Sequence, residues 1–172
     1  MALKYDHPPL LGPGRHFMSL EQLQRLCVRN YGDAGGSISW QTRFQLFTSL
    51  EQLVQALLVA RIRCDVFVNG SFLTKKAVPG DVDVIVTVEK AIYETLSDEQ
   101  MQVFDSINDN AFAPNVDGLA FVAYPREHEH HGFGLDGSVQ IEGYGVEHSG
   151  EWLKGFAVLR LWETDVGNRI CR

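Results

Sequence analysis

Residues 66–88 read VFVNGSFLTKKAVPGDVDVIVTV. Two runs rich in β-branched residues flank a Gly70-Ser71 turn and a lysine-rich loop, and Asp81 and Asp83 stand at the start of the second run. Side chains two residues apart on a strand project from the same face, so the two carboxylates point the same way. The segment therefore predicts a strand, a phosphate-binding turn and a second strand that brings its carboxylates opposite the turn.

This segment contains each group that a nucleoside triphosphate and its magnesium need. Gly70 allows the backbone to approach a phosphate closely, and Ser71 adds a hydroxyl donor. Asp81 and Asp83 supply the hard oxygen ligands that Mg²⁺ prefers. Two such ions about 3.5–4 Å apart activate an attacking hydroxyl and stabilise a leaving pyrophosphate. Two loop lysines, Lys75 and Lys76, can neutralise phosphate charge. The pattern favours nucleotidyl transfer, and a plain turn beside a polar strand entrance stays open as the alternative.

The composition limits the class of protein. A chain of 172 residues with 45% hydrophobic residues predicts one domain over 1–172, with an extended Pro- and Gly-rich arm at about 1–17. The net charge of −7 argues against an extensive nucleic-acid surface or an anionic membrane as partner. No apolar run suits a membrane span, no export signal is evident, and Cys27, Cys64 and Cys171 are widely spaced, so we expect a cytoplasmic protein with reduced thiols.

The remaining sequence predicts an α+β fold with a mixed sheet of about five strands flanked by helices. Capping boxes at Ser19/Gln22 and Ser97/Gln100 begin two of the helices. The expected helices span 20–30, 40–62 and 98–108, and the expected strands span 65–69, 82–88, 119–124, 138–142 and 155–162.

The stretch NGSFLTKKAVPGDVDVIV, residues 69–86, resembles the Gly-Ser and Asp-x-Asp signature of the DNA polymerase beta nucleotidyltransferase superfamily in its small bacterial form. Residues 8–23, the long helix, Tyr124-Pro125 and residues 151–161 are similar to a bacterial group of nucleotidyltransferase-like proteins of largely unassigned function. The resemblance implies a nucleotidyltransferase-like mixed sheet, a triphosphate at Gly70-Ser71, and three acidic residues that bind two magnesium ions.

The third acidic residue of that pattern has no clear counterpart. It is expected on the strand at 119–124, and the aligned position is Ala120. Asp117 is the nearest carboxylate, but it has the opposite strand parity to Ala120, so it serves only if the strand begins after it and the chain bends. Glu142 is a weaker substitute on another expected strand. Asp117 as the third ligand, and a chain that has lost this ligand, both stay open.

Two further groups are candidate site residues. Lys154 precedes the last expected strand, where a cation can reach a triphosphate, although a surface lysine is the simpler interpretation. The histidines of the loop REHEHHG, residues 126–132, can bind a transition metal, but such loops are more often simply solvated: His128, His130 and His131.

These observations lead to two functional hypotheses. The first is a magnesium-dependent nucleotidyltransferase that moves a nucleoside monophosphate from a triphosphate to a hydroxyl on a protein partner, a nucleotide signal or a nucleic-acid end. The resemblance places such proteins beside a toxin or in antiviral defence. The second is a catalytically incomplete fold that senses a nucleotide or docks to a partner, and Ala120 motivates it.

Overall fold

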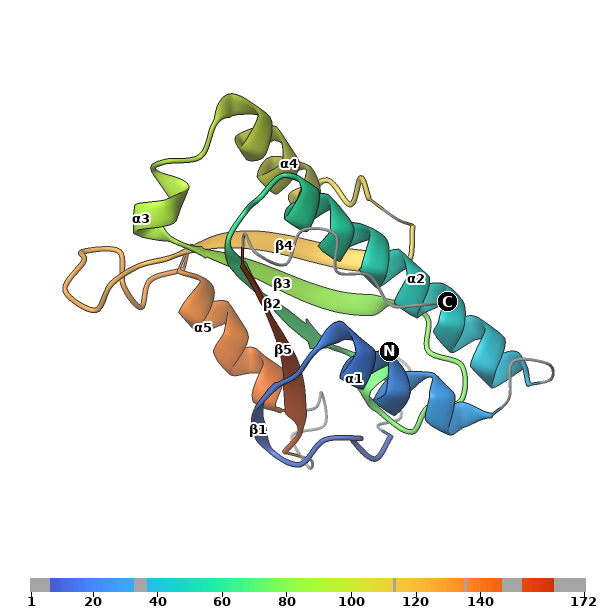
Figure 1. Ribbon diagram of the computed structural model, residues 1–172. Helices are drawn as coiled ribbons and strands as arrows, with labels where there is room; N and C mark the ends of the chain where they lie inside the picture. Colours follow the sequence, from blue (N-terminus) through green and yellow to red (C-terminus); the bar gives the residue numbers. More distant parts are fainter. Residues whose placement is uncertain (1–6, 33–36, 113, 135, 147–152, 163–172) are drawn as a thin grey trace.

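The computed structural model describes residues 7–32, 37–112, 114–134, 136–146 and 153–162. Cys171 lies outside these residues. The fold is α+β, as the sequence predicts, with a five-stranded mixed sheet flanked by helices (Figure 1). The strands are β1 Gly14–Phe17, β2 Cys64–Asn69, β3 Val82–Glu89, β4 Val116–Ala123 and β5 Gly155–Leu161. The helices are α1 Leu20–Cys27, α2 Ile38–Val59, α3 Lys90–Tyr93, α4 Asp98–Asn108 and α5 Gly137–Glu142.

The strand order β1-β5-β2-β3-β4 places β2 and β3 inside the sheet. β2 pairs antiparallel with both β5 and β3, whereas β3 pairs with β4 in parallel and β1 pairs with β5 in parallel. The Gly-Ser turn follows β2, and the Asp pair lies at the start of β3, so the turn and the start of β3 lie at the same end of the sheet. The beginning of β4 reaches that end too, because it runs parallel to β3.

The two faces of the sheet differ in their cover. Val66 and Val68 of β2 and Val84 and Val86 of β3 point toward one face and are buried. α4 covers this face at β4, where a side chain at Gly118 would meet Ile107. Figure 1 shows α2 and α4 on this side and α5 on the other. A side chain at Gly137 of α5 would touch Thr87, which faces the opposite way from Val86.

The helix starts follow the predicted local signals. The Ser19 and Ser97 hydroxyls each accept a hydrogen bond from the backbone N–H of the residue three positions on. Oε1 of Gln22 and of Gln100 accepts one from the backbone N–H of the serine, so both capping boxes are confirmed. The long helix begins two residues earlier than expected, at Ile38, because the side chain of Ser37 caps it. It ends at Val59 and is followed by Arg61 with a positive φ of 56°.

One expectation about the elements is wrong. Residues 138–142 form part of helix α5 rather than a strand, because buried Asp136 caps the segment by accepting a hydrogen bond from the Ser138 backbone. The fifth strand is instead β1, within the predicted N-terminal arm, where Gly14 pairs with Gly155. Residues 1–6 of that arm lie outside the described part of the chain.

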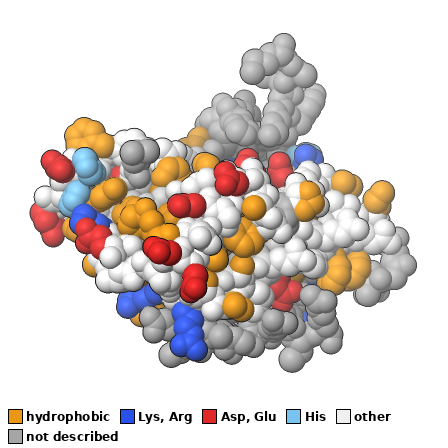
Figure 2. Space-filling model, turned by 90° about the horizontal axis from the view of Figure 1, so that it is seen from above, with side chains coloured by type: hydrophobic (Ala, Val, Ile, Leu, Met, Phe, Trp, Pro, Cys, Tyr) orange, Lys and Arg blue, Asp and Glu red, His pale blue; other side chains and the backbone are white. Residues whose placement is uncertain are grey.

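The length of the helices and the charge of the surface can be compared with the sequence predictions. None of the helices among the described residues combines the length and apolarity needed to cross a bilayer. Acidic side chains recur across the face that is seen from above in Figure 2, in keeping with the net charge of −7.

Candidate functional site

The turn after β2 needs a glycine at residue 70. Gly70 has a φ of 78°, in the region that residues with a side chain rarely adopt. A Cβ atom built on Gly70 would lie 1.6 Å from Oδ2 of Asp83. The Asp83 carboxylate is therefore packed against the bare Cα of Gly70. Ser71 then begins a single 3₁₀ turn, Ser71–Leu73, in which the Leu73 N–H donates to the Gly70 carbonyl at 3.2 Å.

A buried arginine that the sequence analysis missed holds the loop after this turn. Arg43 of α2 has no exposed surface, and its Nη1 donates to the carbonyls of Cys27 at 3.0 Å and Phe72 at 2.9 Å. Its Nη2 donates to the carbonyls of Thr74 and Lys76, each at 2.6 Å. The sequence does contain a signal, because Arg43 is a charged residue within the apolar stripe of a helix.

The aromatic neighbours of Arg43 complete its environment. The guanidinium lies 3.7 Å from the ring centroid of Tyr31, so it is stacked as well as hydrogen-bonded. Burial lowers the pKa of Arg43, an effect that the nearby Tyr31 and Cys27 oppose. The loop that carries Lys75 and Lys76 is consequently anchored to the helical layer.

Asp83 lies in a row of polar residues that crosses three strands. In the β2–β3 pair Asn69 is opposite Asp83, and in the β3–β4 pair Asp83 is opposite Asp117. Neighbouring strands lie about 4.8 Å apart, and opposed residues point to the same face. We call Asn69, Asp83 and Asp117 the acid row. Asp81 is exposed just before β3, where the Val82 N–H donates to the Asn115 carbonyl at 2.9 Å.

The register corrects the sequence analysis at position 120. Ala120 is opposite Val86, so it lies on the face that the helices cover, where a carboxylate could not join Asp83. Asp117 reaches the row without a bend, because β4 begins at Val116 and not after Asp117. Glu142 is not on a strand at all; it is the exposed last residue of α5.

Tyr144, in the turn after α5, faces the acid row. Burial raises the pKa of Tyr144, and the negative charges of Asp83 and Asp117 raise it further. The Tyr144 carbonyl accepts a hydrogen bond at 3.5 Å from Nδ2 of Asn69, which is only 5% exposed. Oδ1 of Asn69 is buried and has no hydrogen-bond partner among the described residues. Asn69 directly precedes the Gly-Ser pair, a position that hints at its role, whereas nothing in the sequence marks Tyr144.

The three predicted lysines differ in their placement. Lys154 is 7% exposed and directly precedes β5. β5 pairs antiparallel with β2, with Ala157 opposite Val68, so Lys154 lies at the end of the sheet where the Gly-Ser turn follows β2. The backbone N–H of Lys75 donates to the Pro8 carbonyl at 2.8 Å, which ties it to the N-terminal arm. The Lys76 carbonyl binds Arg43, so only the backbone positions of these two loop lysines are fixed by described contacts.

A family model matches residues 3–165 of the chain. The protein belongs to DUF6932, a family of unknown function. No curated protein and no solved structure matches the chain. The matched span includes the Gly-Ser turn, the acid row and Lys154, so the whole candidate site is part of the DUF6932 region.

The magnesium that the superfamily resemblance implies can be compared with the donors of this DUF6932 protein. Within the described residues, no group of three or more His, Cys, Asp or Glu side chains is gathered closely enough to hold a metal ion. The donor chemistry nevertheless fits, because two opposed carboxylates lie beside a buried amide oxygen that lacks a partner among those residues. Asp83 and Asp117 would hold the ion, and the exposed Asp81, just before β3, is the nearest further carboxylate along the chain.

The histidine loop of the DUF6932 chain is organised by packing. His131 places its Nδ1 2.9 Å from the Tyr124 carbonyl and 3.2 Å from Oδ2 of Asp136. The rings of His128 and His130 lie against Tyr124, with centroids 4.7 and 5.5 Å away. The loop follows the end of β4, whereas the acid row is at the beginning of that strand, so the structure does not bring the histidines to the acid row.

Proposed function

We propose that this DUF6932 protein is a magnesium-dependent nucleotidyltransferase, which moves a nucleoside monophosphate from a triphosphate to a hydroxyl acceptor. One observation carries the proposal: Asp83 is opposite Asp117 in the sheet, directly beside a turn that only glycine can form. Close backbone approach and adjacent hard oxygen ligands are the two requirements of a triphosphate with its metal.

Each residue of the site has a separate role in this proposal. Gly70 lets the turn pack directly against the Asp83 carboxylate, and we assign the Ser71 hydroxyl as a donor to a phosphate. Lys154, at the same end of the sheet as the Gly-Ser turn, supplies positive charge to the same phosphates. Asp83 and Asp117 would hold magnesium, with Asp81 as the further ligand. A magnesium ion held there would supply Lewis-acid activation of a hydroxyl and stabilisation of negative charge on a leaving pyrophosphate. Arg43 keeps the loop between Ser71 and Asp81 in place.

The net charge of the chain limits the class of acceptor. A net charge of −7 disfavours a long nucleic-acid substrate, so a protein partner or a small nucleotide fits better than a polymer backbone. We place the reaction in the cytoplasm, in the setting that the resemblance suggests: modification of a toxin or effector, or synthesis of a nucleotide signal in antiviral defence.

The test is pyrophosphate release and label transfer with each of the common nucleoside triphosphates, labelled on the α-phosphate, in the presence of magnesium. Asp83→Asn and Asp117→Asn should each lower the rate at least about a hundredfold, because each removes a carboxylate ligand of the magnesium. The control is Asp105→Asn, which removes the same charge from an exposed position on α4 and should leave the rate unchanged. Loss in Asp83→Asn but full activity in Asp117→Asn would contradict the role of Asp117.

A second function is favoured by one observation. The described carboxylates do not gather into a group of three that could hold a metal ion. An incomplete fold of this kind would bind a triphosphate at Gly70-Ser71 without turning it over, and would act as a nucleotide-sensing or partner-binding module. Calorimetric titration with a non-hydrolysable triphosphate separates the two functions. Binding with no pyrophosphate release for any base or partner supports the module, and turnover excludes it.

A further inference from the structure

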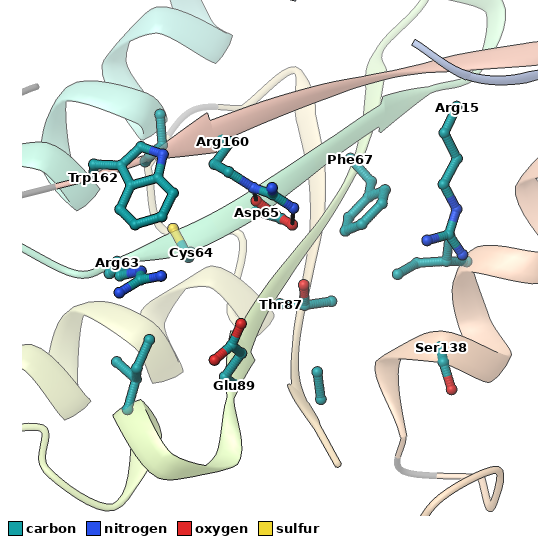
Figure 3. Close-up of a pocket in the computed structure, with 14 residues that line it drawn as sticks. Arg15, Arg63, Cys64, Asp65, Phe67, Thr87, Glu89, Ser138, Arg160 and Trp162 are labelled. Carbon is teal, nitrogen blue, oxygen red and sulfur yellow. Dashed lines mark hydrogen bonds and ion pairs between the residues drawn. The ribbon is translucent and has the colours of Figure 1, made fainter. Parts of the chain in front are cut away.

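A cavity of about 280 Å³ lies on the same face of the sheet as the acid row, but at the opposite end. Its lining includes Asp65 of β2 and its register partner Thr87 of β3. Thr87 is four residues along β3 from Asp83, a separation of about 13 Å on a strand. Ser138 of α5 lies on one side of the cavity (Figure 3), and Ile141 of the same helix also lines it. The cavity is thus separate from the proposed nucleotide site.

Three arginines line this cavity, and each one lies over an aromatic ring. The guanidinium carbon of Arg63 is 3.9 Å from the ring centroid of Trp162. The corresponding distances are 5.0 Å from Arg160 to Phe17 and 5.9 Å from Arg15 to Phe67. Stacking uses the face of a guanidinium and leaves the N–H groups at its edge available to an acceptor.

Arg160 is held more firmly than the other two. Its Nε and Nη2 donate to the two oxygens of Asp65, both at 2.9 Å, across the β2–β5 pair. A bidentate pair of this kind fixes the plane of the guanidinium. Figure 3 shows Arg63 beneath Trp162 on one side of the Arg160–Asp65 pair and Arg15 on the other. Because contacts within the protein hold the arginines, a ligand would not need to order all three.

The charges of the cavity favour an anion. Arg15, Arg63 and Arg160 face the two carboxylates of Asp65 and Glu89, which leaves one excess positive charge in a chain of net charge −7. Within the described part of the chain, neither Arg15 nor Arg63 forms a salt bridge. These two cations therefore flank an ion pair that is already satisfied.

The rest of the lining sets the size and polarity of a ligand. Phe67 and Ile141 are buried apolar residues of the lining and can contact a small carbon skeleton. The Thr87 hydroxyl and the Glu89 carboxylate can accept hydrogen bonds from ligand hydroxyls. A volume near the lower end of ligand-pocket sizes, about 300 Å³, suits a metabolite and not a polymer.

We propose that this cavity binds a small hydroxylated molecule with a phosphate or carboxylate group, and that Arg63, beside Trp162, provides the donors for that oxyanion, while Arg15 contributes positive charge from the other end of the cavity. This site does not rest on the proposed transferase activity, because no residue of the acid row lines the cavity. Phosphate and carboxylate share the bidentate geometry that an arginine edge recognises, so the probes must distinguish them.

The test is isothermal titration calorimetry of the full chain with ribose 5-phosphate and, separately, with malate. Binding of at least one probe is expected, and the stronger of the two identifies the oxyanion. Arg63→Gln should weaken binding at least about tenfold, because a charge-assisted hydrogen bond is lost. Arg25→Gln, which removes the same charge from α1 outside the cavity, should leave affinity within about twofold.

Two results would overturn the proposal. One is the absence of heat from both probes at millimolar concentration while circular dichroism shows a folded protein. The other is equal weakening by Arg63→Gln and Arg25→Gln, which would indicate attraction to surface charge alone. Asp83→Asn should bind the probes like the wild type, and this separates a failure of the cavity from a failure of the transferase site.

Discussion

The two faces of the sheet use the same strands differently. On the helix-covered face β2 and β3 present valines, and all of these side chains are buried. On the other face the same strands are apolar only in the middle, at Phe67 and Ile85, and α5 packs against β3 and β4 there. Polar residues occupy both ends of that face, with the acid row at one end and the Arg160–Asp65 pair at the other. One face therefore stabilises the fold, and the other positions chemical groups.

Arg43 of α2, on the helix-covered face, anchors the loop between Ser71 and Asp81. Its replacement should have the largest effect on stability. Arg43→Ala leaves four backbone carbonyls without their charged donor, so we expect the free energy of unfolding to fall by about 4 kcal/mol. Urea unfolding followed by circular dichroism measures this change. Arg25→Ala, at an exposed ion pair, should change it by less than about 0.5 kcal/mol. Similar effects of the two changes would show that Arg43 is not a structural anchor.

A pair of core substitutions tests the difference between the faces directly. Val86→Ala removes two methyl groups from a fully buried site on the helix-covered face, and should lower the free energy of unfolding by about 2 kcal/mol. Leu119→Ala, on the face of the acid row, removes more carbon from a side chain that is 44% exposed and should lower it by less than about 1 kcal/mol. The reverse order in urea unfolding would mean that the wrong face has been assigned to the core.

Gly70→Ala should act at the acid row more than on the core. The new Cβ would collide with Oδ2 of Asp83, and the residue would keep a positive φ. We therefore expect the free energy of unfolding to fall by about 1–2 kcal/mol. Gly80→Ala is the matched control, because no atom lies within 4 Å of the position that its new methyl group would take. Triphosphate affinity, measured by calorimetry, should fall in the first variant and not in the second. Unchanged affinity in Gly70→Ala would remove the turn from the site.

The smallest expected effect concerns the cap of α5 and depends on pH. Burial tends to raise the pKa of Asp136, but hydrogen bonds from Gly132 and Ser138 outweigh it and lower the pKa below its ordinary value of 3.8. A lowered pKa in the folded state means that the stabilisation is complete above the ordinary value and is lost as pH falls below it. Wild-type stability should therefore drop between about pH 4 and pH 2 by more than that of Asp136→Asn, in urea titrations at each pH. Parallel pH profiles would show that the cap carboxylate is not stabilising.

The sequence predicted the features that depend on local chemistry. Ser19 and Ser97 mark real capping boxes because the partners lie three residues away, and Asp83 shares a strand with the valines around it. For residues 138–142 the sequence predicts a strand because Val139 and Ile141 alternate with polar residues. The segment is helical because the Asp136 side chain caps it. β1 has no β-branched residue, and its strand exists through pairing with β5 far along the chain.

The same limit applies to the candidate site. Gly70, Ser71 and Asp83 lie close in sequence, so their spacing was informative. The position of Asp117 depends on the register between β3 and β4. Asp83 and Asp117 are 34 positions apart in the chain, and local sequence does not predict a register between such distant residues. Alignment to Ala120 was off by an odd number of residues, and an odd shift exchanges one face of a strand for the other. Arg43 and Tyr144 reach their partners through tertiary contacts alone.

The central claim, that Asp83 and Asp117 belong to one metal and nucleotide site, is tested most directly by a crystal structure with magnesium and a non-hydrolysable nucleoside triphosphate. We expect the phosphates at the Gly70-Ser71 turn, and carboxylate oxygens of both Asp83 and Asp117 within about 2.0–2.1 Å of bound magnesium. A triphosphate bound away from the turn, or magnesium held without Asp117, would contradict the claim.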